Sequence, residues 1–151
     1  MPETGQRVDP FRSFNFLVEL DGLGVAQASF MECSGLGATT EVVEFRQGGD
    51  NTTVYKLPGK TTYSDITLKW GITTDKTLWA WRQQIIDGDV VRKNGAIVLY
   101  DVGNHREVAR WSFFNAWPTR WEGPTLSARG SEVAVDTLVL AHEGIRREQR
   151  P

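Results

Sequence analysis

The sequence predicts an all-β fold with one α-helix, arranged as a β-sandwich or barrel. Apolar and polar residues alternate over many short segments, which is the pattern of half-buried strands. Glycine and proline separate these segments, with 15 Gly and 6 Pro in 151 residues, as expected of short strands joined by turns. The length fits a single domain, residues 1–151, with about seven or eight strands around one core.

The N-terminal part predicts an arm followed by a pair of strands. Residues 1–12 are polar and are expected to form an extended arm. Residues 14–20 alternate, with phenylalanine, valine and leucine on one face, and predict a strand. Asp21-Gly22 predicts a turn, after which Val25 to Cys33 forms a partner strand. Ser34 to Gly37 is expected to end this strand.

Residues 38–70 predict a long hairpin whose tip projects from the body. Its outgoing strand, up to Arg46, is rich in β-branched residues. The polar, glycine-rich residues 47–51 then read as a flexible tip. The returning half has three expected parts: a strand from Thr53 to Leu57, an interruption at Pro58-Gly59, and an alternating strand from Tyr63 to Trp70 with Ile66, Leu68 and Trp70 on one side.

One stretch, Lys76 to Asp87, lacks glycine and proline and predicts a helix. Thr74 or Asp75 is expected to be its N-cap residue, and Gly88 stands where a C-cap glycine belongs. The helix is expected to pack on the sheet through one apolar stripe.

The helix carries two apolar stripes. Leu78, Trp81 and Ile85 follow the i, i+3, i+7 spacing of the stripe expected to face the core. Trp79 and Ile86 form a second stripe nearby. This second stripe is either the wide edge of the first or a surface that meets a neighbouring subunit.

The C-terminal half predicts further hairpins and a frayed tail. Glycine and proline pairs are expected to mark its turns. The expected elements are a turn at Asn94-Gly95, a strand from Ala96 to Val102, a turn at Gly103-Asn104, a strand from Glu107 to Ala116, turns at Trp117-Pro118 and Gly123-Pro124, a strand from Ser131 to His142, and a charged tail from Ile145 to Pro151.

Composition excludes several classes of protein. The formal net charge is −2, so no basic surface predicts specific nucleic-acid binding. A single cysteine, Cys33, allows no intrachain disulfide. The N-terminus shows no signal-peptide pattern, and no apolar run is long enough for a membrane span. We therefore expect cytoplasmic synthesis without a signal peptide.

The sequence predicts no catalytic, cofactor-binding or metal site. Gly59-Lys60-Thr61 suggests a phosphate-binding loop, but that motif needs a glycine where Val54 stands. Cys33, His105 and His142 are too few for a zinc site and are better explained as structural residues. The carboxylates show no spacing that pairs them for acid–base catalysis.

An aromatic stretch that includes Trp111, Trp117 and Trp121 allows another reading. Exposed aromatics on a β-sandwich stack on sugar rings, which would make the chain a carbohydrate-binding module. Core packing and subunit contact are the other uses of such residues, since tryptophan is a favoured anchor at interfaces. We favour the second explanation because a sugar-binding module is unexpected in the cytoplasm.

Eight segments, in order over nearly the whole chain, carry a family resemblance. They are Asp9 to Phe16, Cys33 to Gly37, Glu41 to Gly49, Lys56 to Gly59, Ile66 to Gly71, Leu78 to Trp81, Phe113 to Pro118, and Ala141 to Gly144. Together they resemble the phage tail tube protein family, the inner-tube subunits of contractile phage tails and extracellular contractile injection systems. The chain departs from this pattern at Lys69-Trp70, where two basic residues are expected.

The resemblance implies a structural subunit and not an enzyme. Six copies would form a ring, and stacked rings would form a hollow conduit for cargo with a tail-tube fold in each subunit. The partners would be the chain itself, a contractile sheath, baseplate proteins and tube-capping proteins, in a phage-tail-like particle that can be released from the cell. A tube-initiator paralogue at the baseplate is an alternative that needs the same ring.

The resemblance also gives a role to the hairpin tip, which would reach the adjacent ring. Its residues are Gln47, Gly48, Gly49, Asp50, Asn51, Thr52 and Thr53. Alternation further places four residues off the core face, toward either the lumen or the outer surface of a tube. These four are Glu44, Arg46, Thr67 and Lys69.

Overall fold

The computed structural model describes residues 16–21, 24–25, 30–49, 52–72, 76–101 and 106–148. These residues form ten strands and one helix. In chain order they are β1 (Phe16–Leu20), β2 (Gly24–Val25), β3 (Phe30–Ser34), β4 (Ala38–Phe45), β5 (Tyr55–Tyr63), β6 (Ile66–Gly71), α1 (Thr77–Ile86), β7 (Lys93–Tyr100), β8 (Glu107–Glu122), β9 (Val135–Ala141) and β10 (Gly144–Glu148). The predicted all-β class with one helix is confirmed, with more strands than the seven or eight expected.

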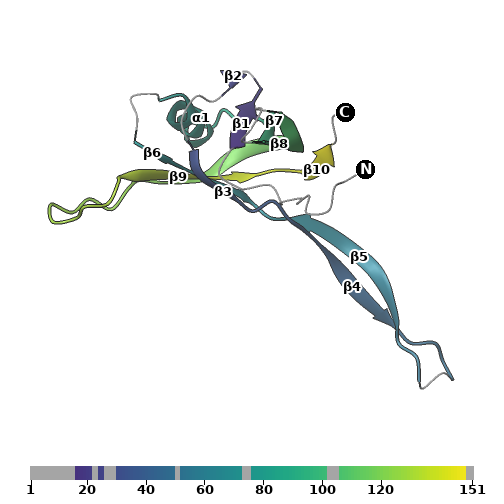
Figure 1. Ribbon diagram of the computed structural model, residues 1–151. Coiled ribbons are helices and arrows are strands. Elements are labelled where there is room, and N and C mark those ends of the chain that lie inside the picture. The colour runs from purple at the N-terminus through teal and green to yellow at the C-terminus, as the bar shows by residue number, and fades with distance from the viewer. Residues whose placement is uncertain are drawn as a thin grey trace, which may run out of the picture.

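Eight of the strands form one antiparallel sheet with the order β2-β1-β7-β8-β9-β6-β3, in which β10 also pairs with β8. The long β8 joins two parts of this sheet, because its first half pairs with β7 and β10 and its second half with β9. Between the halves lies Asn115, whose φ of 53° is left-handed. The body of the molecule is built around this curved sheet, while β4 and β5 form a separate hairpin that projects from it (Figure 1).

The core lies where the two parts of the sheet and the helix meet. The predicted alternation in β6 is confirmed, because Ile66, Leu68 and Trp70 are buried. They join a cluster with buried residues from the far part of the sheet, among them Val18 of β1 and Phe113 of β8. Burial of large aliphatic and aromatic side chains from both parts of one sheet is what makes it curl around a single core.

The helix packs through two of the three residues of its predicted core-facing stripe, and the third, Ile85, is half-buried. Leu78 and Trp81 are buried, and the Trp81 indole Nε1 donates a hydrogen bond to the carbonyl of Val91 at 2.8 Å. The N-cap position is Lys76, without a side-chain cap; the expected caps Thr74 and Asp75 lie outside the described residues.

The helix ends directly before its predicted C-terminal glycine, because its last residue is Ile86, its C-cap is Asp87 and Gly88 follows. Gly88 adopts a φ of +91° and its N–H donates to the carbonyl of Ile85, while the N–H of Asp89 donates to Gln84. These two bonds satisfy the carbonyl groups of Ile85 and Gln84 in the last turn of the helix, and the left-handed φ favours glycine at this position.

The predicted partner strand from Val25 to Cys33 is wrong. Its ends belong to two strands, since β2 pairs with β1 and β3 pairs with β6 at the far side of the sheet. A partner strand continuous over 25–33 would have to pair along β1 throughout, whereas Cys33 stands opposite Leu68. The turn at Asp21-Gly22 falls between the paired residues Leu20 and Gly24, although Gly22 itself is outside the described residues.

The projecting hairpin is shorter and more continuous than predicted. It ends at Tyr63, and Ser64 and Asp65 separate it from β6 in the main sheet. The expected interruption at Pro58-Gly59 is wrong, because β5 runs through it. The register shifts there by a β-bulge, which absorbs a proline in a two-stranded edge where it costs no central hydrogen bond.

Two further predicted turns lie inside strands. Gly95 is within β7, where a Cβ atom would stand 2.5 Å from the Glu19 carbonyl oxygen and 2.5 Å from the Phe113 ring. Glycine is therefore required for close approach and not for a turn. Trp117-Pro118 lies within β8, at a register shift between Pro118 and Arg120 that accommodates the proline.

The predicted frayed tail, Ile145 to Pro151, is wrong for residues 145–148, which belong to β10 (Gly144–Glu148). In this strand Ile145 stands opposite Phe113 of β8 and packs against the core. β8 ends at Glu122, directly before Gly123-Pro124, but the predicted turn there is wrong, because the chain turns later, where the N–H of Gly130 donates to the Ser127 carbonyl at 3.1 Å. The predicted arm of residues 1–12, Phe14, the turn at Gly103-Asn104, Val102 and residues 149–151 all lie outside the described residues.

Candidate assembly surface

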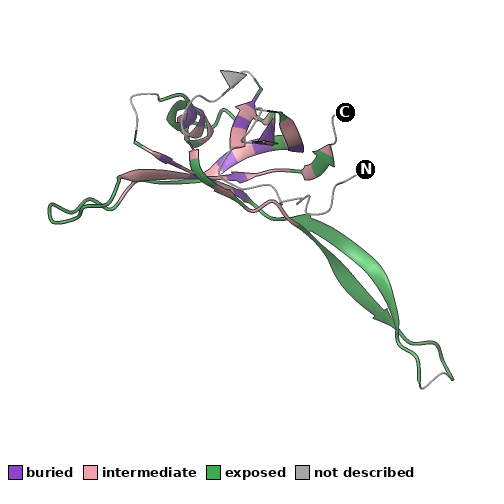
Figure 2. Cartoon of the chain, viewed as in Figure 1, coloured by how far each residue is buried: buried purple, intermediate pink, exposed green. Residues whose placement is uncertain are grey.

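The β4–β5 hairpin is the most exposed element of the described chain. Every residue of both strands is exposed, and Figure 2 shows the hairpin without a buried or half-buried residue. A two-stranded hairpin is at best marginally stable in water unless another surface covers one of its faces. The hairpin is therefore the element of the described fold that most needs a partner.

One face of the hairpin is apolar. Val43 stands directly opposite Leu57, and Phe45 opposite Tyr55, so all four side chains project from the same side of the ribbon. Their exposed fractions are 48%, 49%, 50% and 42%. We call these four residues the shaft face. The opposite side is mixed, with Glu44 across from Lys56 and Val42 across from Pro58.

The predicted tip joins the two strands at the far end of the hairpin (Figure 1). Gln47, Gly48 and Gly49 are exposed, as are Thr52 and Thr53, while Asp50 and Asn51 lie outside the described residues. Gly49 has a φ of +89°, and a Cβ at Gly48 or Gly49 would meet no atom within 4 Å. The tip is thus open to contact on the described side.

The helix stripe of Trp79 and Ile86 is also exposed, with fractions of 45% and 59%. The helix lies across the body from the hairpin (Figure 1), so the structure does not bring this stripe together with the tip. Two separated apolar surfaces on one chain suit head-to-tail contact between copies better than a two-fold contact.

The four residues predicted off the core face do not form one surface. Glu44 and Arg46 are exposed in the hairpin, whereas Thr67 and Lys69 are half-buried in β6, on the side opposite its buried residues. The Lys69 Nζ lies 3.5 Å from the Glu32 carboxylate on β3.

A charged cluster that the sequence analysis did not single out surrounds Arg110 of β8. The guanidinium donates to Glu19 Oε2 at 2.8 Å, and to both carboxylate oxygens of Glu107 at 3.2 and 2.8 Å. These hydrogen bonds, first that to Glu107 and then that to Glu19, raise the pKa of Arg110 above its ordinary value. In the sequence, the one sign of this cluster is a permanently charged arginine, Arg110, within a strand that is otherwise rich in aromatic and apolar residues.

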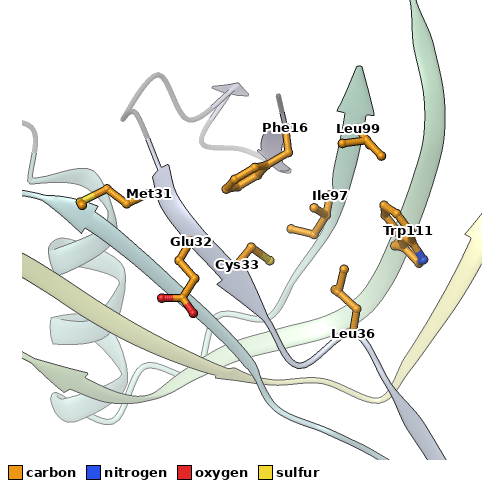
Figure 3. A pocket seen from close by; sticks show the side chains of 8 residues that line it. All are labelled: Phe16, Met31, Glu32, Cys33, Leu36, Ile97, Leu99 and Trp111. Carbon is orange, nitrogen blue, oxygen red and sulfur yellow. The ribbon is translucent and has the colours of Figure 1, made fainter. Parts of the chain in front are cut away.

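An apolar pocket of about 240 Å³ opens between β3 and the β1–β7–β8 part of the sheet. Figure 3 shows Cys33 in it, with Phe16, Ile97 and Trp111 on the facing side. Burial, aided by the charge of Glu32, raises the pKa of Cys33 to about 12. A thiol with this pKa is protonated at neutral pH and is a poor nucleophile.

Neither histidine proposed as a possible partner of the Cys33 thiol lies beside it in the described part of the chain. His142 does not line this pocket, and its ring lies instead against Tyr63 and Phe113. His105 lies outside the described residues. Over the described ranges, no three His, Cys, Asp or Glu side chains come together as they would around a metal ion. Nor is any helix in the described part of the chain long and apolar enough to cross a membrane.

The aromatic stretch of β8 does not form one exposed platform. Phe113 is fully buried, Trp111 and Trp117 are half-buried, and Trp121 is 39% exposed. Trp111 packs against the core. Their use is therefore mainly internal packing, which leaves a carbohydrate-binding function without a structural basis.

This architecture matches that of a known protein family. The family model of T4-like virus tail tube protein gp19 matches residues 12–146. No match is found among curated protein sequences.

Solved structures show the same fold. A chain in the anti-feeding prophage (AFP) baseplate structure, 6-fold symmetrised, has a TM-score of 0.85 and 25% identity, and the match covers 94% of this chain and 97% of that one. A chain in the sheath/tube terminator of the extracellular contractile injection system PVC, in the extended state, has a TM-score of 0.83 and 26% identity over 94% and 99%. Hcp1 from Flavobacterium johnsoniae shares the fold alone, with a TM-score of 0.58 and 12% identity over 89% and 94%. The chain therefore belongs to the T4-like virus tail tube protein gp19 family, and it is a tail-tube structural protein rather than an enzyme.

Proposed function

We propose that this protein is the inner-tube subunit of a contractile phage-tail-like injection particle. Copies assemble as hexameric rings, and the rings stack into a hollow conduit through which cargo is delivered. Its partners are other copies of itself, a sheath, a baseplate and a tube-capping protein. We expect the assembled particle to be released from the cell, because the similar PVC chain belongs to an extracellular contractile injection system.

The observation that carries this proposal is the exposed shaft face on a projecting hairpin. Val43, Phe45, Tyr55 and Leu57 expose about half of their surface in the isolated chain, and covering them removes apolar area from water. A second copy of the chain is the partner that a homo-oligomeric ring or stack offers. The sheet edges β2 and β3, which pair on one side with β1 and β6, offer further sites where ring closure can satisfy backbone groups.

The similar structures also suggest how many copies of the chain form a ring and where in the particle that ring lies. The anti-feeding prophage baseplate was symmetrised six-fold, which supports six copies in a ring. Chains similar to this one occur in baseplate and terminator structures. A tube-initiator ring at the baseplate is therefore the second candidate, and it differs from the main tube subunit in forming single rings without growing into tubes.

Electron microscopy of the purified protein, with and without its baseplate partners, tests the proposal. Rings with a central channel that lengthen into tubes are expected for the main subunit, and rings that never lengthen for the initiator. A monomer at high concentration, with no rings or tubes under any seeding, would contradict both.

A matched pair of substitutions tests the shaft face. Leu57→Ser removes an apolar side chain from it, whereas Lys56→Ser changes the neighbouring exposed residue on the opposite side of the ribbon. We expect Leu57→Ser to abolish or weaken assembly while the monomer keeps its melting temperature, and Lys56→Ser to assemble. Equal assembly of both variants would show that the shaft face is not a subunit contact.

The tip and the helix stripe are proposed as further contacts. Deleting residues 48–51 should abolish the stacking of rings before it affects folding, because a Cβ at Gly48 or Gly49 would meet no atom of the described residues within 4 Å. Trp79 and Ile86 are expected to meet a neighbouring subunit. Loss of folding together with loss of stacking in the deletion variant would contradict the role of the tip.

A further inference from the structure

The direction of the hairpin is set at a small joint and not along its length. Both strands are exposed throughout, so the body does not support them from the side. The chain enters the hairpin through residues 35–37 and leaves it through Ser64 and Asp65. Whatever fixes these two connecting segments therefore fixes where the shaft face points.

The backbone of the joint is tightly packed. The N–H of Ser64 donates to the Gly37 carbonyl at 3.1 Å, and the N–H of Gly37 donates to Gly35 at 2.9 Å. Gly35 has a φ of +90°, and a Cβ atom there would lie 1.9 Å from the Asp65 carbonyl oxygen. The two connecting segments thus cross in contact, and glycine is required where they cross.

His142 ties this joint to the body. Its Nε2 lies 2.9 Å from the carbonyl oxygen of Ser64. A carbonyl only accepts hydrogen bonds, so Nε2 carries the proton and donates it. The centre of the imidazole ring also lies 5.8 Å from the centre of the Tyr63 ring, at the end of β5, and 6.3 Å from the centre of the Phe113 ring. Phe113 is fully buried, so the histidine connects the core to the base of the hairpin.

The position of His142 itself is fixed by β8. The residue lies between β9 and β10, whose adjacent residues Ala141 and Gly144 pair with β8. The N–H of Glu143 donates to the Phe114 carbonyl at 2.9 Å, and Asn115 Nδ2 donates to the Glu143 carboxylate at 2.7 Å. The chain on both sides of His142 is therefore fixed to β8, which positions the residue beside the base of the hairpin.

We propose that His142 is a positioning residue that fixes the direction of the β4–β5 hairpin relative to the body. It does so through its hydrogen bond to Ser64 and its ring contact with Tyr63. The consequence for assembly rests on the proposed function, because a shaft face pointing in many directions cannot meet a neighbouring copy in one geometry. The direction itself is a property of the single chain.

Distance measurement on the dilute protein tests the inference. Spin labels at Gly48→Cys, on the tip, and Gln84→Cys, on the helix, are placed in a Cys33→Ala background and measured by pulsed electron paramagnetic resonance. The otherwise native protein should give one narrow distance distribution. His142→Ala should broaden it, since losing a hydrogen bond and a ring contact raises the population of other hairpin directions by about 5- to 30-fold.

Conservative variants separate the two contacts. His142→Gln keeps an N–H donor for the Ser64 carbonyl, and His142→Phe keeps a ring beside Tyr63, so each should restore part of the narrow distribution. Thr62→Ala is the matched control, because Thr62 is exposed in the same strand but projects from the side opposite to Tyr63. It should leave the distances unchanged.

Several results would overturn the inference. One is a folded His142→Ala variant, with an unchanged near-ultraviolet spectrum, that keeps the narrow distribution. If that variant does not fold, Tyr63→Ala removes the ring contact from the hairpin side, and unchanged distances in it would have the same meaning. Normal tubes from a His142→Ala protein with broad distances would overturn the role in assembly, whereas failure of the native protein to assemble would count only against the proposed function.

Discussion

Replacing Arg110 by methionine should destabilise the protein strongly, since it removes the cation that two carboxylates share. The Arg110 side chain is 11% exposed, and those of Glu107 and Glu19 are 18% and 33% exposed. Methionine keeps most of the aliphatic stem that packs on the sheet. The substitution therefore leaves two carboxylates of like charge in a partly buried site without their donor.

The magnitude follows from this geometry. Breaking a buried ion pair from one side costs about 3–5 kcal/mol, and we expect about 3 kcal/mol because a third of Glu19 is open to solvent. At this chain length a loss of about 3 kcal/mol lowers the melting temperature by about 6–12 °C. Glu19→Gln alone should cost only about 1 kcal/mol, because Arg110 keeps both of its hydrogen bonds to Glu107.

The assay is urea unfolding followed by tryptophan fluorescence, at several pH values. Protonation of the carboxylates in acid removes the unbalanced charge from the Arg110→Met variant. Its deficit in the free energy of unfolding relative to the native protein should therefore shrink as the pH is lowered. In addition, Arg110→Met combined with Glu19→Gln should lose less than the two single variants added together.

Two results would refute this reasoning. A deficit that is independent of pH would mean that Arg110 contributes by packing and not by charge. Strict additivity of the double variant would mean that Arg110 and Glu19 do not interact in solution, despite the 2.8 Å separation of their polar atoms.

Three further predictions concern other sites. Gly95→Ala should lower the free energy of unfolding by about 1–3 kcal/mol through overpacking, because its Cβ would overlap the Phe113 ring. The control Gly48→Ala, in open space, should change the free energy of unfolding by less than about 0.5 kcal/mol, and equal melting temperatures of the two variants would contradict the placement of Gly95. Burial raises the pKa of Cys33 to about 12 from an ordinary 9.0, so its thiolate at pH 8 is about a thousandfold scarcer than that of an exposed cysteine. A thiol reagent should therefore modify Cys33 slowly until guanidinium unfolds the chain, and rapid modification of the folded protein would contradict the raised pKa. Burial likewise raises the pKa of Asp136 above 3.8, so the folded state binds this proton more tightly than the unfolded chain, and the stability of the protein falls as the pH rises through the raised pKa. Asp136→Asn should therefore melt at a higher temperature than the native protein at pH 7, with a difference that narrows near pH 4. A lower melting temperature of this variant at pH 7 would contradict the prediction.

Local patterns were sufficient for part of the fold. The alternation of Ile66, Leu68 and Trp70 predicted which face of β6 is buried, since successive strand residues point to opposite sides of a sheet. The helix and its end at Gly88 followed from spacing and from a residue type that suits a left-handed backbone. The exposed second stripe at Trp79 and Ile86 was likewise visible in the helical spacing.

Glycine and proline were the least reliable guides where they lie within strands. Gly95 and Pro118 stand in residue pairs that often form turns, yet both are inside long strands. The sequence does not reveal whether a glycine provides a left-handed backbone or space for a neighbour. That depends on Phe113, which approaches Gly95 only after β7 and β8 have paired.

The sequence by itself determined the strand-rich class, the helix, the exposed hairpin and the family resemblance, because each depends on residues close together in the chain or on their order along it. The tertiary structure decided that residues 144–148 form a strand, that Arg110 bonds to Glu19 from 91 positions away, and that His142 reaches Ser64 from 78 positions away. Such partners are chosen by strand order and register. These emerge only when the whole sheet closes on its core, because moving one strand by a single residue turns every side chain to the other face.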